Sequence, residues 1–135
     1  MNRTLLLTGG TGKFGQVLVR HFAENGWKVI ATSRKQWRVD QLVCDIGVTK
    51  GKVMGIAVDL QQQDASQRLV NELTERGIVI THLVNNARSM ETLAVKPGGT
   101  TERGAFVGEF EMDVVVPYEL AICLSRSESH NLKTV

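Results

Sequence analysis

The chain has 135 residues, of which 42% are hydrophobic and 22% are charged, and these proportions indicate one folded domain rather than a disordered chain. Its 16 basic and 14 acidic side chains leave a formal net charge of +2. So small an excess gives no electrostatic reason to expect binding to nucleic acid or to an anionic membrane.

Apolar segments of two kinds follow one another along the chain. Short apolar runs predict buried strands at 4–8, 28–33, 52–60 and 78–87. Apolar residues at helical spacing predict helices at 14–25, 35–46 and 62–76. Gly26 and Gly77 directly follow two of these helices, where glycine commonly ends a helix.

The last third of the chain is less regular. Residues 90–104 hold Pro97 and several glycines, which predicts a loop. Residues 105–126 predict one long helix, and Pro117 should kink that helix or lie near its start. Residues 132–135 (LKTV) are typical of the first residues of a fifth strand.

This alternation of strands and helices predicts the fold class. Connections of such length imply right-handed crossovers between parallel strands, with helices on both faces of the sheet. We expect an α/β fold, a three-layer doubly wound parallel sheet of the Rossmann type. Its strand order would be 3-2-1-4, with a fifth strand beginning at the C-terminus. Residues 1–135 would form one such dinucleotide-binding domain.

A glycine-rich turn, within LLLTGGTGKFGQVLV at residues 5–19, separates the first strand from the first helix. The phosphate loop of nucleotide hydrolases needs Ser or Thr after its Gly-Lys pair, but Phe14 stands there. Gly9, Gly12 and Gly15 instead have the GxxGxxG spacing of a dinucleotide-binding turn. They would permit a tight turn, close approach of the backbone to a pyrophosphate, and close packing of helix on strand. The N–H groups at the start of the helix would face the phosphates.

Two further stretches strengthen this interpretation. VDL at 58–60 ends the third predicted strand, and NNAR at 85–88 ends the fourth. Together with TGGTGKFG at 8–15, they make the chain resemble the short-chain dehydrogenase/reductase family over essentially its whole length. That family carries TGxxxGxG or TGxxGxxG after the first strand, Asp after the third and NNAG after the fourth.

The resemblance implies cofactor-binding roles in all three motifs. The residues that would line the pyrophosphate are Gly9, Thr11, Gly12, Phe14 and Gly15. Asp59 would accept a hydrogen bond from the adenine amino group, and the Leu60 N–H would meet the adenine ring. The residues that would border the adenosine ribose are Asn85, Asn86 and Ala87. The competing interpretations are a turn residue at a strand end for Asp59 and an ordinary turn for Asn85-Asn86.

The end of the second predicted strand bears on the choice between nicotinamide cofactors. An acidic residue there usually selects NAD, but this chain has TSRK at 32–35. Arg34 and Lys35, with the hydroxyl of Ser33 and the charge of Lys13, suit a 2′-phosphate. We therefore expect NADP(H) in preference to NAD(H). The alternative is that Arg34 and Lys35 are solvated charges at a helix start.

The catalytic residues of the family are mostly missing from this chain. In relatives a Tyr, a Lys four residues later and a Ser assist hydride transfer, and an Asn on the preceding helix holds a water. The only tyrosine, Tyr118, is followed four residues later by Ile122, and the family's Ser lies on the fifth strand. Asp113 aligns with the family's Asn and is the candidate catalytic residue, unless it is an ordinary polar helix residue.

One further departure concerns Arg88, which stands where the family usually has glycine. Its side chain would narrow the nicotinamide side of the cleft or reach a phosphate.

The resemblance predicts the N-terminal part of an NADP(H)-dependent oxidoreductase that transfers hydride to or from a carbonyl or alcohol. The parent would be an enzyme, and this chain alone would be inactive. The alternative is a stand-alone dinucleotide-binding or regulatory module without catalysis. Relatives that act on nucleotide sugars share the GxxGxxG spacing, but the NNA stretch argues against that branch.

Besides the cofactor, the expected partner is a second copy of the chain, through the predicted helix at 105–126. The apolar residues expected to lack cover there are Phe106, Val107, Phe110, Val114, Val115, Leu120 and Leu124. Cys44 and Cys123 lie far apart and the three histidines are scattered, so we expect neither a disulfide nor a metal site. No apolar run approaches the ~20 residues of a membrane span or the length of a signal peptide, which favours the cytoplasm.

Overall fold

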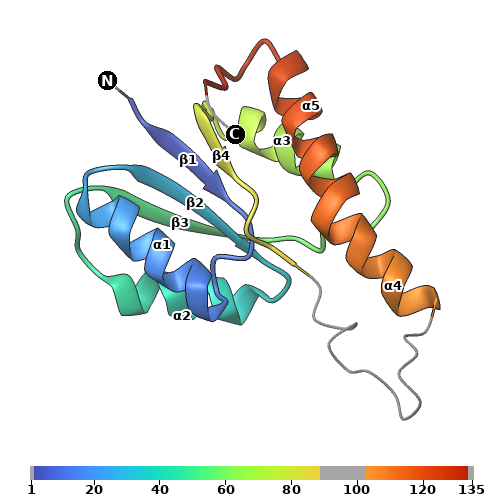
Figure 1. Cartoon of the computed structure of the whole chain (residues 1–135). Helices are drawn as coiled ribbons and strands as arrows, with labels where there is room; N and C mark the ends of the chain where they lie inside the picture. The colour runs from blue at the N-terminus through green and yellow to red at the C-terminus, as the bar shows by residue number, and fades with distance from the viewer. Residues whose placement is uncertain (1, 89–102, 134–135) are drawn as a thin grey trace.

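A four-stranded parallel sheet lies at the centre of the molecule (Figure 1). The structure is a computed structural model that describes residues 2–88 and 103–133. The strands are β1 (Thr4–Leu7), β2 (Lys28–Ser33), β3 (Lys52–Ala57) and β4 (His82–Val84). They are ordered β3-β2-β1-β4, so the predicted order 3-2-1-4 is confirmed.

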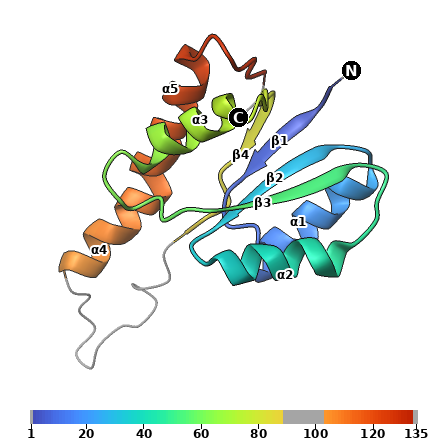
Figure 2. The same cartoon turned by 180° about the vertical axis from the view of Figure 1, so that it is seen from behind.

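Helices cover both faces of this sheet (Figures 1 and 2). The helices are α1 (Lys13–Glu24), α2 (Gln36–Ile46), α3 (Ala65–Glu75), α4 (Arg103–Phe110) and α5 (Val116–Arg126). Helices α1 and α2 lie on one face, and α3 and α5 on the other. Leu6 of β1 faces the α3–α5 core while Leu5 and Leu7 face the α1–α2 core, because successive strand residues point to opposite faces. A central strand covered on both faces is therefore apolar at successive positions, as Leu5, Leu6 and Leu7 are.

Two strands are shorter than their apolar runs because side chains replace main-chain partners at their ends. The Asp59 carboxylate accepts the Gln61 N–H at 3.1 Å, which turns the chain two residues after β3. Near the start of β4, Thr81 Oγ1 accepts the Thr4 N–H at 2.9 Å. At the end of β4, Thr8 Oγ1 accepts the N–H groups of Asn86 and Ala87. These groups would pair with main-chain carbonyls if the strand continued.

The predicted long helix at 105–126 is present but is not regular. A π-helical turn, Glu111–Val115, joins α4 to α5, and Pro117 is the second residue of α5. Pro117 therefore lies near the start of a helix, as expected. Leu120 and Leu124 are fully buried against the sheet and α3, so the expectation that these two lack cover is wrong. Residues 90–102 of the expected loop at 90–104 lie outside the described residues, and Arg103 and Gly104 belong to α4 rather than to a loop.

The C-terminal segment runs beside the residues that lead into β4. The Asn131 N–H donates to the Ile80 carbonyl at 3.1 Å, and the Lys133 N–H donates to the Thr81 carbonyl at 2.7 Å. Residues 131–133 do not form a strand, and residues 134–135 of the expected fifth strand lie outside the described residues.

His130 anchors this segment to the fold. Its Nδ1 accepts the Ile80 N–H at 3.0 Å, so the proton of the neutral ring resides on Nε2. Nε2 lies 3.1 Å from Thr74 Oγ1, whose hydroxyl donates to the Val70 carbonyl at 3.0 Å. Burial lowers the pKa of His130 below its usual 6.5, with an opposing contribution from the Val70 carbonyl. Protonation at Nδ1 would also break the hydrogen bond with the Ile80 N–H, because both groups would then be donors.

The free energy of unfolding should therefore fall as the pH drops below about 6.5, because the unfolded histidine takes up a proton more readily than the buried ring. His130 contributes its full stability above that pH and loses it as the pH falls through the lowered folded-state pKa. Urea unfolding at about pH 7.5 and about pH 5 measures the change, and His130→Gln should reduce it. An equal pH dependence in the wild type and His130→Gln would contradict this role.

Candidate functional site

The glycine-rich turn after β1 lies at the carboxyl ends of the strands and touches the end of β4. Gly9 has φ +67°, which favours glycine, and a Cβ there would lie 2.8 Å from Ala87 Cα. A Cβ at Gly15 would overlap the Gly9 carbonyl oxygen and lie 2.9 Å from Asn86 Nδ2. Both glycines are therefore required by packing between the turn, α1 and the segment after β4.

Gly12 differs from its two neighbours because packing does not require it. A Cβ at Gly12 would meet only the Gly9 carbonyl oxygen, at 3.6 Å, and the residue is exposed. Gly12 caps α1 without a side-chain hydrogen bond. The N–H groups of residues 13–15 donate to no atom among the described residues. Three N–H groups at the positive end of a helix thus remain available to an anion.

Thr8 fixes the position of the glycine turn relative to the segment after β4. Its buried Oγ1 accepts the Asn86 N–H at 3.1 Å and the Ala87 N–H at 3.0 Å. The Asn86 side chain donates back to the Gly9 carbonyl at 3.0 Å. The network joins the glycine turn to the segment after β4. Sequence reasoning placed Asn86 and Ala87 at the site but assigned no role to Thr8.

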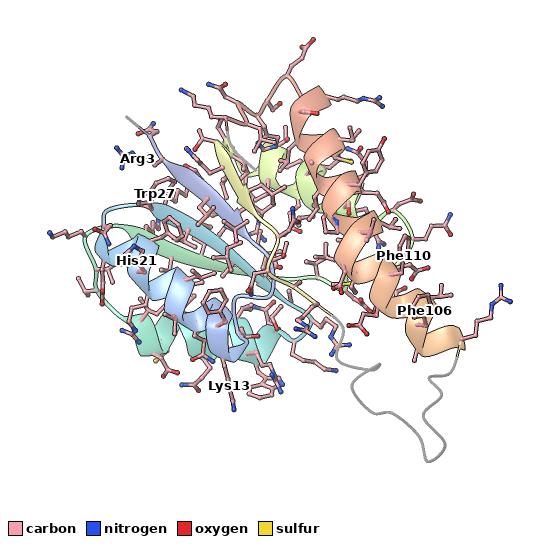
Figure 3. The ribbon with its side chains drawn as sticks, in the orientation of Figure 1. Arg3, Lys13, His21, Trp27, Phe106 and Phe110 are labelled. Carbon is pink, nitrogen blue, oxygen red and sulfur yellow. The ribbon has the colours of Figure 1, made fainter. Side chains whose placement is uncertain are left out.

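The predicted basic cluster lies beside the glycine turn. Thr11 Oγ1 donates to Ser33 Oγ at 2.9 Å, which ties the turn to the end of β2. Arg34 and Lys35 follow Ser33 and are exposed. Figure 3 shows Lys13 at the start of α1, pointing outward. Arg3 and Trp27 lie at the opposite end of the sheet, with the Arg3 guanidinium 5.4 Å from the Trp27 ring centre (Figure 3).

Asp59 and Leu60 occupy the end of β3 with structural contacts of their own. The Asp59 carboxylate accepts the Gln61 N–H and, at 3.3 Å, Gln62 Nε2, so it already acts as a turn residue. The Leu60 side chain is buried in the core. The contacts of Asp59 are those of the turn residue that the competing interpretation describes.

The α4 end of the site holds a charged pair that sequence reasoning missed. Arg88 Nη2 lies 3.9 Å from Glu109 Oε1, so the Arg88 side chain is directed toward α4. Glu109 Oε2 is buried and has no hydrogen-bond partner. Gln61 Nε2 donates to the Gly108 carbonyl at 3.1 Å and holds α4 against the turn after β3. Asp113 is exposed in the π-helical turn, and π turns often occur at functional positions.

Across residues 2–88 and 103–133, no three side chains of His, Cys, Asp or Glu gather as a metal site would require. In the same ranges, no helix is long and apolar enough to cross a bilayer. Cys44 and Cys123 are both free thiols, and burial raises the pKa of Cys123, with Glu119 adding to the rise.

Comparisons with known proteins agree with this geometry. A family model described as short chain dehydrogenase matches residues 3–101. Serine 3-dehydrogenase of Agrobacterium fabrum is 39% identical over 87 residues, which are 64% of this chain and 34% of the relative. An NADP-dependent 3-hydroxy acid dehydrogenase of Salmonella typhi is 36% identical over 62% of this chain and 32% of its own length. The chain thus spans about a third of the length of these curated relatives.

Solved structures share the fold. A metagenomic short-chain oxidoreductase, crystallised in complex with NADP, superposes with a TM-score of 0.78 at 22% identity. The alignment covers 91% of this chain and 55% of that chain. At this identity the likeness concerns the fold, and it agrees with the doubly wound sheet seen here.

Proposed function

The chain belongs to the short-chain dehydrogenase family, and on that basis we propose that it is the N-terminal, cofactor-binding part of an NADP(H)-dependent oxidoreductase. The observation that carries the proposal is the open position at Gly12 beside three available N–H groups of α1. Its relatives include proteins named as dehydrogenases of serine and of 3-hydroxy acids. A carbonyl or alcohol is the substrate class that we propose for the parent enzyme.

The cofactor pyrophosphate would bind across the glycine turn. Gly12 would let the phosphates approach the backbone, and the N–H groups of Phe14 and Gly15 would donate to their oxygens. Thr11 lies in the same turn and would contact the phosphates from its other side. Gly9 contributes indirectly, because its tight turn brings β1 and Ala87 together.

The adenosine end would lie over the ends of β2, β3 and β4. Lys13, Ser33, Arg34 and Lys35 would bind a 2′-phosphate, and this supports our proposal of NADP(H) over NAD(H). The residues that would contact the adenine and its ribose are Asp59, Leu60, Asn85, Asn86 and Ala87.

Nicotinamide, when bound, supplies or accepts the hydride. Within this chain, Asp113 is the residue that we propose for the position of the family's water-holding Asn. Arg88 and Glu109 would lie between the end of β4 and α4, beside the nicotinamide.

Gly12→Ala tests the cofactor site without disturbing the fold, because the added Cβ meets only an ordinary contact. NADPH at about 100 times its dissociation constant should stabilise the wild type by about 2.7 kcal/mol. The variant should keep the melting temperature of the ligand-free wild type but lose most of the increase on addition of NADPH. Thermal denaturation with and without NADPH measures both. An undiminished increase in Gly12→Ala would place the ligand elsewhere.

We also propose that the chain self-associates through α4 and α5. Phe106, Phe110, Val114 and Tyr118 recur every fourth residue and are 63%, 54%, 49% and 65% exposed. Figure 3 shows Phe106 and Phe110 on α4, which projects beyond the sheet. Such a stripe is self-complementary when two copies pair about a twofold axis.

Phe110→Glu should shift the chain from dimer to monomer, because a charge would be placed in the middle of the paired stripe. The variant should remain folded, since Phe110 is outside the core. Light scattering at several concentrations measures the mass. Val48→Glu, a charge at a fully exposed apolar residue elsewhere, is the control and should leave the mass unchanged. A monomeric wild type would refute self-association.

A further inference from the structure

Helix α4 lacks the packing that holds the other helices to the sheet. None of its eight residues is buried, and none belongs to either core cluster. Its aromatic residues, Phe106 and Phe110, are exposed, whereas α5 buries Val116, Leu120 and Leu124. Figures 1 and 2 show α4 beyond the edge of the sheet, continuing the line of α5. Core packing therefore contributes little to keeping α4 in place.

The sequence of α4 gives the helix little stability of its own. Helices shorter than ~12–15 residues are marginal in water, because few hydrogen bonds offset the cost of nucleation. Gly104 and Gly108 lie within α4, and glycine is among the poorest helix formers. The π-helical turn Glu111–Val115 and Pro117, which has no N–H to donate, interrupt the regular hydrogen bonding between α4 and α5. The position of α4 thus depends on its contacts with the rest of the fold.

Besides its connection to α5, two polar side-chain contacts hold α4 to the described part of the fold, residues 2–88 and 103–133. Gln61 Nε2 donates to the Gly108 carbonyl at 3.1 Å. Arg88 Nη2 lies 3.9 Å from Glu109 Oε1. This ion pair is long, and more than half of the Arg88 side chain is exposed, so water screens the attraction. The hydrogen bond of Gln61 is shorter and partly buried, which makes Gln61 the stronger anchor.

Gln61 also connects α4 to the expected adenine end of the cofactor site. Its own N–H donates to the Asp59 carboxylate at 3.1 Å. Asp59 and Leu60, which directly precede Gln61, are the residues that we propose for contact with adenine. A ligand that restrains the Asp59 carboxylate therefore restrains the main chain of Gln61, and with it the side chain that reaches α4.

We propose that Gln61 is a positioning residue through which cofactor binding orders α4. The inference rests on the proposed function, because adenine bound at Asp59 is the event that restrains Gln61. In the free chain, α4 opens and closes locally, as a helix with no buried residue does. With the cofactor bound, the restrained Gln61 side chain holds the Gly108 carbonyl for more of the time, so α4 is helical for more of the time. The π-helical turn that carries Asp113 is then fixed as well.

Hydrogen exchange of the α4 amides tests this role on the whole chain, at a concentration where light scattering shows a monomer. In the free chain these amides should exchange faster than those on the buried face of α5. Saturating NADPH should slow them about fivefold or more, the lower end of typical coupling between two sites. The last turn of α5 frays at the opposite end of that helix from α4 and should not respond to NADPH (Figure 1).

Gln61→Met keeps the length of the side chain and removes its amide donor. In the free variant, the α4 amides should exchange about twofold or more faster than in the wild type, as expected for the loss of one neutral hydrogen bond. NADPH should then slow them by less than about twofold. A Gln61 that only supported the fold would speed exchange equally with and without NADPH.

Gln62→Met is the matched control, because Gln62 is the next residue and its amide contacts Asp59 but not α4. This variant should keep the full effect of NADPH on the α4 amides. Loss of the effect in Gln62→Met as well would place the coupling at Asp59 rather than at the Gly108 contact, and would refute the role of Gln61.

The possible failures are distinguishable. If the wild type bound no NADPH, the proposed function would fail and this coupling with it. If NADPH bound but left the α4 amides unchanged, or slowed them equally in Gln61→Met, the cofactor site would stand and the role of Gln61 would be refuted. Exchange in α4 as slow as on the buried face of α5 in the free chain, or equal slowing in the last turn of α5, would refute it too.

Discussion

Gly15→Ala is expected to lower the free energy of unfolding by about 3 kcal/mol or more, at the upper end for an overpacked core position. The added Cβ would overlap the Gly9 carbonyl oxygen and press on Asn86 Nδ2 and Gly10 Cα. These atoms belong to backbone and to a hydrogen-bonded amide, so they cannot move away as a flexible side chain would. Urea unfolding measures the loss.

Gly12→Ala is the matched control, because it adds the same methyl group three residues earlier in the same turn. Its nearest neighbour would be 3.6 Å away, and its φ of −70° suits alanine. The unfolding free energy should change by less than about 0.5 kcal/mol. Similar losses in the two variants would mean that the turn tolerates no substitution anywhere, and the packing role assigned to Gly15 would then be wrong.

Thr8→Val is expected to lower the unfolding free energy by about 1–3 kcal/mol, because two partly buried N–H groups lose their acceptor at once. Valine keeps the shape of threonine, so the loss reports the hydrogen bonds of Asn86 and Ala87 rather than packing. Hydrogen exchange of these two amides should accelerate in parallel with the loss of stability.

Thr8→Ser keeps the hydroxyl and removes one methyl group. We expect it to cost about 1 kcal/mol, the value of one buried methylene or methyl group. If valine were tolerated better than serine, Thr8 would act through its apolar contacts, and the proposed connection between β1 and the end of β4 would not depend on its oxygen.

The sequence predicted the alternation of strands and helices through periodic features, and the strand order followed from the doubly wound architecture that this alternation indicates. The buried strand Thr4–Leu7 holds three consecutive leucines, and helices such as Lys13–Glu24 have one apolar face. The expectation that Leu120 and Leu124 would be uncovered failed for a related reason. Both lie on the inner face of α5, and spacing shows that a helix has an apolar face but not which element covers it.

The sequence predicted which residues lie at the candidate site, but it did not predict the contacts between them. The glycine spacing identified Gly9, Gly12 and Gly15 together, whereas the structure separates two packing positions from one open position. Thr8 and Asn86 are 78 residues apart, so no local pattern shows their hydrogen bond. The contact between Arg88 and Glu109 likewise joins residues that are distant in sequence.

Isothermal titration of NADPH and NADH into the chain tests the account most directly, because both the open glycine turn and the basic residues around it are assigned to one cofactor. We predict one NADPH bound per chain, with an affinity about tenfold or more above that for NADH, as a charge-assisted phosphate contact provides. Binding of NADH at least as tight as that of NADPH would contradict the assigned preference. The absence of binding by either cofactor would contradict the proposal that this chain is a cofactor-binding domain.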